Sequence, residues 1–179
     1  MNTRPYGAES PRIGARVWID PAAVVIGRVE IGDDASLWPM VVARGDVNFI
    51  RIGARTNIQD GSVLHVTHDG PYSPGGIPLL IGSDVTVGHR VMLHACTIGD
   101  HCLLGMSSTV LDGAVLEEEV FLGAGSLVPP GKRLEARSLY RGSPARRVRA
   151  LSEEELGMLR YSAEHYQRLK NRYLQGEAT

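Results

Sequence analysis

Apolar residues recur every six positions through most of the chain. The series opens at Ile13 and runs to Leu134, with a three-residue phase slip before Ile52 and an insertion after Leu64. A period of six matches neither the 3.6-residue helix nor the alternation of a half-buried strand. It is typical of a coil built from short strands and sharp corners. The pattern therefore predicts an all-β solenoid, with a β-sandwich of short strands as the alternative.

Three positions of each hexad have a preferred residue type. The first is aliphatic, and we expect it to point into the coil. Glycine often comes second, where we expect it to supply backbone freedom near a corner. The fifth residue is small or β-branched, as a narrow interior requires; examples are Ala35, Thr56, Ser62, Val85, Thr97, Ser108 and Ser126.

The chain divides into three stretches. Residues 1–12 form an irregular lead-in, residues 13–150 carry the repeat, and residues 151–179 carry a helical pattern. Ser152 followed by Glu155 is a capping box at a helix start. Apolar residues then follow at helical spacing, namely Leu156, Leu159, Tyr166, Leu169 and Tyr173. We expect this helix to pack along the outside of the coil.

Composition argues against several classes of function. The net charge of −1 and the lack of a basic stripe make nucleic acid an unexpected partner. No apolar run of about eighteen residues occurs, so no segment is expected to span a membrane. The first residues lack the apolar core of a secretory signal, and we expect no disulfide between Cys96 and Cys102. These features predict a cytoplasmic protein.

Two histidines fall one turn of the repeat apart. His65 and His94 are each second in their hexads and are 29 residues apart. The insertion after Leu64 accounts for 11 of these residues, which leaves 18, or three hexads. The two imidazoles should therefore stack on neighbouring rungs, about 4.8 Å apart. At that spacing they can share one metal ion, since Zn–N bonds are about 2.0–2.1 Å.

A third histidine, His89, has a different rank in its hexad. It is third, so it leaves the coil from the preceding face, and sharing a metal with His94 of the same chain is strained. A neighbouring subunit supplies it more easily, which predicts metal sites between the chains of a homo-oligomer. Zinc is the expected metal, with iron(II) or cobalt as alternatives. The loop 66–79 directly follows His65 and is a candidate gate.

Several motifs resemble those of the γ-class carbonic anhydrases, in particular their smaller bacterial, YrdA-like branch. They are ARGD at 43–46, NIQD at 57–60, LHVTHD at 64–69, VGHRVMLHACTIGD at 87–100, GAGSLVPPGKRL at 123–134 and LYRGSPAR at 139–146. The resemblance implies a left-handed parallel β-helix of hexapeptide repeats that forms a homotrimer, with a C-terminal α-helix. It also implies that His65 and His94 bind metal from one subunit and His89 from the next.

The resemblance also assigns roles to polar residues. Gln59 matches the glutamine that orients metal-bound water, and Arg44 matches an arginine near the site. Asp46 and Asp60 match aspartates that form ion pairs with this arginine within or between subunits. Asn57 belongs to the same hydrogen-bond network. For both aspartates, structural pairing without chemistry is an equal alternative.

The activity so implied is reversible hydration of carbon dioxide to bicarbonate. Three neutral imidazoles leave a coordination position where the pKa of bound water falls to about 7, and the resulting hydroxide attacks carbon dioxide. The archetypal enzyme carries proton-shuttling glutamates, but here Val47 follows Asp46 and the loop 66–79 contains no Glu. His68 or Asp69 is the candidate replacement, His68 having the better intrinsic pKa. We therefore expect weak turnover.

Two other classes of function stay open. Many hexapeptide solenoids are acyltransferases that bind an acyl-CoA between subunits, so this chain is alternatively an acyl-CoA thioesterase or acyltransferase. The second alternative is a non-catalytic, metal-bound trimeric scaffold, which predicts bound metal without carbon dioxide hydration.

Overall fold

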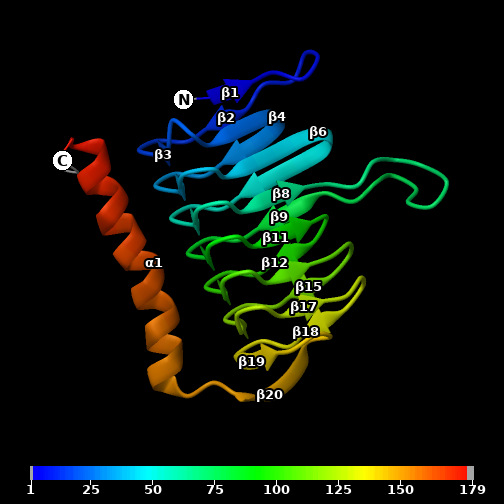
Figure 1. The fold of residues 1–179 in the computed structure, drawn as a ribbon, viewed down its shortest axis with the longest axis vertical. Helices are drawn as coiled ribbons and strands as arrows, with labels where there is room; N and C mark the ends of the chain where they lie inside the picture. Colours follow the sequence, from blue (N-terminus) through cyan, green and yellow to red (C-terminus); the bar gives the residue numbers. More distant parts are fainter. Residues whose placement is uncertain (1, 177–179) are drawn as a thin grey trace.

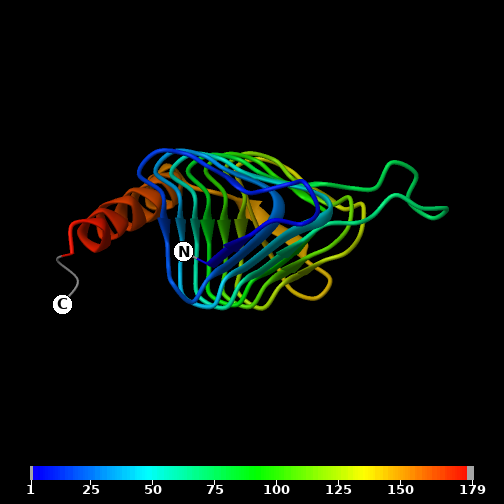
Figure 2. The same ribbon diagram turned by 90° about the horizontal axis from the view of Figure 1, so that it is seen from above.

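The chain coils so that short strands stack in parallel on three faces, with one helix alongside (Figures 1 and 2). The structure is a computed structural model and describes residues 2–176. The first residues of successive hexads form one continuous apolar core along the coil. The predicted all-β solenoid of parallel strands with a C-terminal α-helix is confirmed.

Each face is a stack of strands. The first face holds β1 (Asn2–Arg4), the first parts of β4 (Val24–Ile31) and β6 (Val42–Ile52), β8 (Val63–His65), β11 (Met92–His94), β14 (Thr109–Val110) and β17 (Leu127–Val128). The second holds β2 (Arg12–Ile13), the remainders of β4 and β6, β9 (Leu79–Ile81), β12 (Thr97–Ile98), β15 (Val115–Leu116) and β18 (Arg133–Leu134). The third holds β3 (Trp18–Ile19), β5 (Ser36–Leu37), β7 (Asn57–Ile58), β10 (Thr86–Val87), β13 (Leu103–Leu104), β16 (Phe121–Leu122), β19 (Ser138–Arg141) and the antiparallel β20 (Arg146–Ala150).

The corners of the coil lie at the fourth position of the hexad. Asp34, Arg55 and Asp84 all occupy this position and have positive φ values of 60°, 58° and 57°. The expectation that the second-position glycines supply this freedom is wrong. They are needed because stacked rungs approach closely: a Cβ on Gly53 would lie 2.4 Å from the carbonyl carbon of Gly82.

The fifth position is buried, as predicted, in most hexads; Val17 and Lys132, near the two ends of the coil, are only half-buried. Ala35, Thr56 and Ser62 are each 0% exposed. Thr97 is only half-buried, because the coil skips one residue there and Cys96 takes the inward place. Cys96 and Cys102 are both buried and unpaired, and burial raises the pKa of Cys102 to about 12.

The phase slip before Ile52 is a bulge in β6. Gly45 pairs with Gly27 of β4, but the next pairing joins Ile50 to Val29, so residues 46–49 bulge out of the ladder. The bulge leaves the pairing of both flanking segments intact. It places Asp46 beside the histidines described below.

The helix α1 (Glu153–Leu174) packs against the third face. The predicted capping box is present: Ser152 Oγ accepts from Glu155 N–H, and Glu155 Oε2 accepts from Ser152 N–H. Leu156 and Leu159 are buried, as expected. Lys170 is fully buried too, and its ammonium donates to Arg16 O and Asp34 Oδ1, both at 2.7 Å.

The ends of the chain differ in part from expectation. Residues 2–4 form β1, which pairs with Val24–Ile26, so strand structure begins inside the stretch expected to be irregular. Ile13, the first residue of the apolar series, is 37% exposed because it lies near the open end of the coil. The last residues of the C-terminal stretch, 177–179, lie outside the described residues. Within residues 2–176, no helix combines the length and apolar character that crossing a membrane requires.

Candidate metal centre

His65 and His94 stack on the first face, as their spacing predicts. They end β8 and β11 and are direct partners in the parallel ladder. Their ring centroids lie 5.2 Å apart. Nδ1 of His65 faces Nε2 of His94 at 3.1 Å. Two nitrogens bound to one tetrahedral zinc lie about 3.3 Å apart, given Zn–N bonds of about 2.0–2.1 Å.

The other nitrogen of each ring meets a carboxylate. His65 Nε2 lies 3.1 Å from Asp46 Oδ1, and His94 Nδ1 lies 2.6 Å from Asp112 Oδ1. Burial alone would raise the pKa of Asp46, but hydrogen bonds from Arg44, His65 and the Val47 N–H hold it below its ordinary value. The pKa of Asp112 is likewise lowered, since bonds from Thr67 and His94 outweigh its burial.

These contacts determine which nitrogens carry protons. An ionised carboxylate only accepts hydrogen bonds, so His65 Nε2 and His94 Nδ1 must be the N–H groups of their rings. In neutral imidazoles the facing nitrogens, Nδ1 of His65 and Nε2 of His94, then both present lone pairs. Two facing lone pairs at this distance repel each other unless a proton or a metal ion lies between them. Burial lowers the pKa of His65.

Arg44 and Asp46 form an ion pair within the chain. Arg44 Nη1 donates to Asp46 Oδ2 at 2.5 Å, and both residues lie on β6 at the start of its bulge. The resemblance implied this pair, and the structure places it against His65. Asp112 was missed by sequence reasoning: it follows His94 by 18 residues, whereas the turn there has 17, since Leu93 pairs with Val110. We call His65, His94, Asp46 and Asp112 the two-histidine corner.

His89 lies at the other end of the first face, at the corner between β10 and β11. Its Nδ1 lies 2.9 Å from Asp60 Oδ2, one rung away. The two side chains are 40% and 48% exposed. We call this pair the His89 corner. Within one chain, the partner of Asp60 is therefore His89, and the partner of Arg44 is Asp46.

Gln59 and Asn57 lie beside the His89 corner and are buried. Gln59 Nε2 donates to Asn57 Oδ1 at 3.1 Å, and Asn57 Nδ2 donates to Thr86 Oγ1 at 3.1 Å. Thr86 in turn donates to Ser162 of α1. Gln59 and Asn57 are thus joined in one hydrogen-bond network, which does not include Arg44, Asp46 or Asp60 among the described residues. Neither residue has a hydrogen bond to His65 or His94 among the described residues.

The eight predicted site residues on the coil fall into two groups, and one chain does not bring the three histidines together. Considering residues 2–176 of a single chain, no group of three or more His, Cys, Asp or Glu side chains is arranged to hold a metal ion. His68 is exposed in the loop 66–79, which projects from the coil on the side away from α1 (Figures 1 and 2). No hydrogen bond joins His68 to either corner among the described residues.

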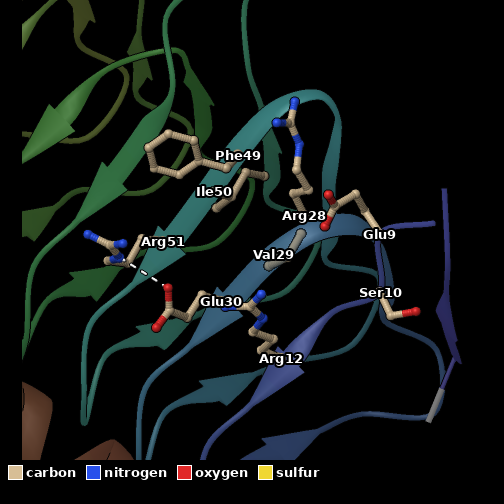
Figure 3. Close-up of a pocket in the computed structure, with 9 residues that line it drawn as sticks. All are labelled: Glu9, Ser10, Arg12, Arg28, Val29, Glu30, Phe49, Ile50 and Arg51. Atoms are coloured by element: carbon tan, nitrogen blue, oxygen red, sulfur yellow. Dashed lines mark hydrogen bonds and ion pairs between the residues drawn. The ribbon is translucent and has the colours of Figure 1, made fainter. Parts of the chain in front are cut away.

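A surface cleft of about 330 Å³ lies elsewhere, between the N-terminal stretch and strands β4 and β6 (Figure 3). Three arginines and two glutamates line it, and Arg51 pairs with Glu30 at 3.3 Å. It contains none of the predicted site residues: its lining is Glu9, Ser10, Arg12, Arg28, Val29, Glu30, Phe49, Ile50 and Arg51. The two histidine corners are therefore separate from this cleft.

Two repeat families match parts of the chain. Residues 10–45 match the family described as bacterial transferase hexapeptide (six repeats). Residues 96–129 match the hexapeptide repeat of succinyl-transferase. Both matches lie on the coil and agree with its six-residue period.

Full-length relatives extend these matches. The chain is 59% identical over 177 residues to Protein YrdA of Escherichia coli, covering 98% of this chain and 96% of the relative. It is 42% identical to mitochondrial gamma carbonic anhydrase 2 of Arabidopsis thaliana over 88% of this chain, but spans only 56% of that relative. A solved hexapeptide transferase family protein from Anaplasma phagocytophilum superposes with a TM-score of 0.87 at 42% identity, covering 96% of this chain and 97% of that one. The chain therefore belongs to the γ-class carbonic anhydrase-like family of hexapeptide-repeat proteins.

Proposed function

We propose that the chain is a metal-dependent carbonic anhydrase-like enzyme that hydrates carbon dioxide reversibly at sites shared between subunits. One observation carries the proposal: Nδ1 of His65 and Nε2 of His94 face each other at 3.1 Å, close to the spacing that one metal ion imposes. Each ring is held by an ionised aspartate on its far side. This is the carboxylate–histidine arrangement that orients metal ligands in proteins.

The third ligand is proposed to be His89 of a neighbouring subunit. The two corners lie at opposite ends of the first face, so a ring of copies brings the His89 corner of one chain to the two-histidine corner of the next. Exposed apolar side chains flank both corners. Met40 and Met106, 67% and 56% exposed, lie near the His89 corner, and Val47 and Phe49 of the β6 bulge, 40% and 37% exposed, lie near the other. A homotrimer closes this ring and covers these side chains.

Each polar residue then has a proposed task. A divalent metal would supply a Lewis acid and a water that ionises near neutral pH. Asp46 and Asp112 fix the ring orientations of His65 and His94, and Asp60 fixes that of His89. Gln59, buried beside Asp60, orients the attacking water with its amide. Arg44 offers a positive charge near the product anion, bicarbonate.

Removal of the proton from the metal-bound water requires an acceptor outside the two histidine corners. The exposed imidazole of His68 is the proposed acceptor; it lies on a projecting loop and makes no hydrogen bond to either corner within residues 2–176. Zinc is the proposed metal, with iron(II) or cobalt as alternatives. The direct test is stopped-flow carbon dioxide hydration by protein of known metal content. Activity that rises with metal content supports the proposal, and its absence at full occupancy favours a metal-bound scaffold.

Acyl transfer is the second candidate function. The matched repeat families are named for transferases, and the Anaplasma phagocytophilum structure is a hexapeptide transferase family protein. In this chain each of the three histidines bonds to an aspartate and is assigned to metal, which leaves no uncommitted histidine at either corner to act as a base for acyl transfer. Turnover of an acyl-CoA by metal-loaded protein, absent after chelation, would instead favour a metal-dependent thioesterase.

A further inference from the structure

The base of the loop 66–79 is hydrogen-bonded to the two-histidine corner. Thr67 Oγ1 donates to Asp112 Oδ2. The other oxygen of the same carboxylate, Oδ1, accepts the Nδ1–H of His94 at 2.6 Å. Thr67 therefore orients the carboxylate that orients His94.

The same threonine is fixed at the neck of the loop. Thr67 and Ile77 exchange two backbone hydrogen bonds, each 3.0 Å long, which close the loop at its base. Asn48 Nδ2 donates to Thr67 O at 3.1 Å, and Asn48 is only 8% exposed. The other side of the loop neck is packed tightly as well, because a Cβ on Gly76 would lie 2.6 Å from both Asn48 Nδ2 and Thr67 O.

Asn48 links this neck to the other histidine. It lies two residues from Asp46 on the β6 bulge, and Asp46 accepts from His65. The loop neck thus reaches His94 through Asp112 and reaches His65 through the bulge. The positions of the two rings and of the loop neck are therefore linked by an unbroken series of contacts.

We propose that Thr67 is a positioning residue for His94 and that the loop 66–79 and the metal site are coupled through it. The proposal rests on the metal binding proposed above. Filling the two-histidine corner tightens the loop neck, and by reciprocity loosening the neck weakens metal binding. The loop is therefore a gate whose closure depends on the metal, and the hydroxyl of Thr67 transmits the effect.

The test compares Thr67→Val with Thr67→Ser on the full-length protein. Valine keeps the shape but cannot donate to Asp112, whereas serine keeps the hydroxyl. We expect Thr67→Val to weaken cobalt(II) affinity, measured by chelator competition, by about 10-fold or more, and to shift the visible spectrum of bound cobalt. Thr67→Ser should restore both. Thr97→Val, a partly exposed strand position on the second face, is the matched control and should change neither.

Hydrogen exchange measures the reverse effect, that of metal binding on the neck of the loop. Metal should slow exchange of the Thr67 and Ile77 amides in the wild type, and should slow it less in Thr67→Val at saturating metal. Equal cobalt affinity and equal loop protection in the two proteins would overturn the coupling while leaving the metal site intact. A wild type that binds no cobalt at the histidines would instead overturn the proposed function.

Discussion

Nδ1 of His65 and Nε2 of His94 face each other at 3.1 Å while their opposite nitrogens donate to Asp46 and Asp112. If the two imidazoles bind metal as proposed, they are oriented before the metal arrives, and little ordering remains to be done on binding. Hydrogen bonds from Arg44 and His65 lower the pKa of Asp46 despite partial burial, and those from Thr67 and His94 lower the pKa of Asp112. We propose that His89 of a second chain completes the coordination of the metal ion.

Removing either stacked imidazole should abolish metal binding without unfolding the coil. His65→Ala and His94→Ala delete partly exposed rings, while the neighbouring Leu64 and Leu93, both 0% exposed, keep the core. We expect bound metal to fall to near zero, with an unchanged circular dichroism spectrum. His165→Ala, at an exposed position on α1, is the control and should bind metal normally. Full occupancy in either alanine variant would show that the ligand assignment is wrong.

The carboxylate behind His65 should matter for metal affinity. Asp46→Asn removes the charge that raises the basicity of His65, and it weakens the Arg44 contact. Loss of such a partner typically costs about 10- to 100-fold in metal affinity, and chelator competition measures it. Glu30→Gln breaks an exposed ion pair with Arg51 and provides the comparison. Identical affinities in the two variants would mean that Asp46 is only structural.

Docking of the helix should depend on one buried ion pair. Asp34→Asn leaves the fully buried ammonium of Lys170 without its countercharge, which should cost about 3 kcal/mol of unfolding free energy. Asp84→Asn is a matched control, because Asp84 has a similar positive φ and its own arginine partner, Arg55, but no buried lysine. Exposed pairs of that kind contribute about 1 kcal/mol or less. Urea denaturation of both variants measures the difference, and equal losses would contradict a special role for Lys170.

The same pair predicts a pH dependence. The hydrogen bond from Arg16 outweighs burial and, with Lys170, lowers the pKa of Asp34 to about 2. A carboxylate whose pKa is lower in the folded state stabilises the fold above its unfolded pKa of about 3.9. That stabilisation is lost as the pH falls from about 4 towards 2. The stability gap between wild type and Asp34→Asn should therefore be constant near neutral pH and shrink below about pH 4; a gap that widens there would contradict the assignment.

The six-residue repeat correctly predicted that His65 and His94 stack, but it did not predict the structure of the corners or of the β6 bulge. Counting hexads across the loop placed His94 over His65, because a fixed rung length makes vertical neighbours predictable. The same count assigned glycine to the corners incorrectly, since it carries no information on how closely stacked backbones approach at Gly53 and Gly82. The bulge at residues 46–49 was visible only as a phase slip. Asp112 and Thr67 were missed because their roles depend on side-chain direction, which the period alone does not give.

Subunit complementation tests the central claim most directly. His89→Ala and His94→Ala chains are co-expressed in equal amounts with distinct tags, and mixed trimers are isolated. If each site takes His65 and His94 from one chain and His89 from the next, every mixed trimer contains one complete site, so about one third of its sites should be restored, measured as bound metal and carbon dioxide hydration, while each variant alone has almost none. Mixed assemblies as empty as the parents would show that a single chain supplies all three ligands, and would contradict the account.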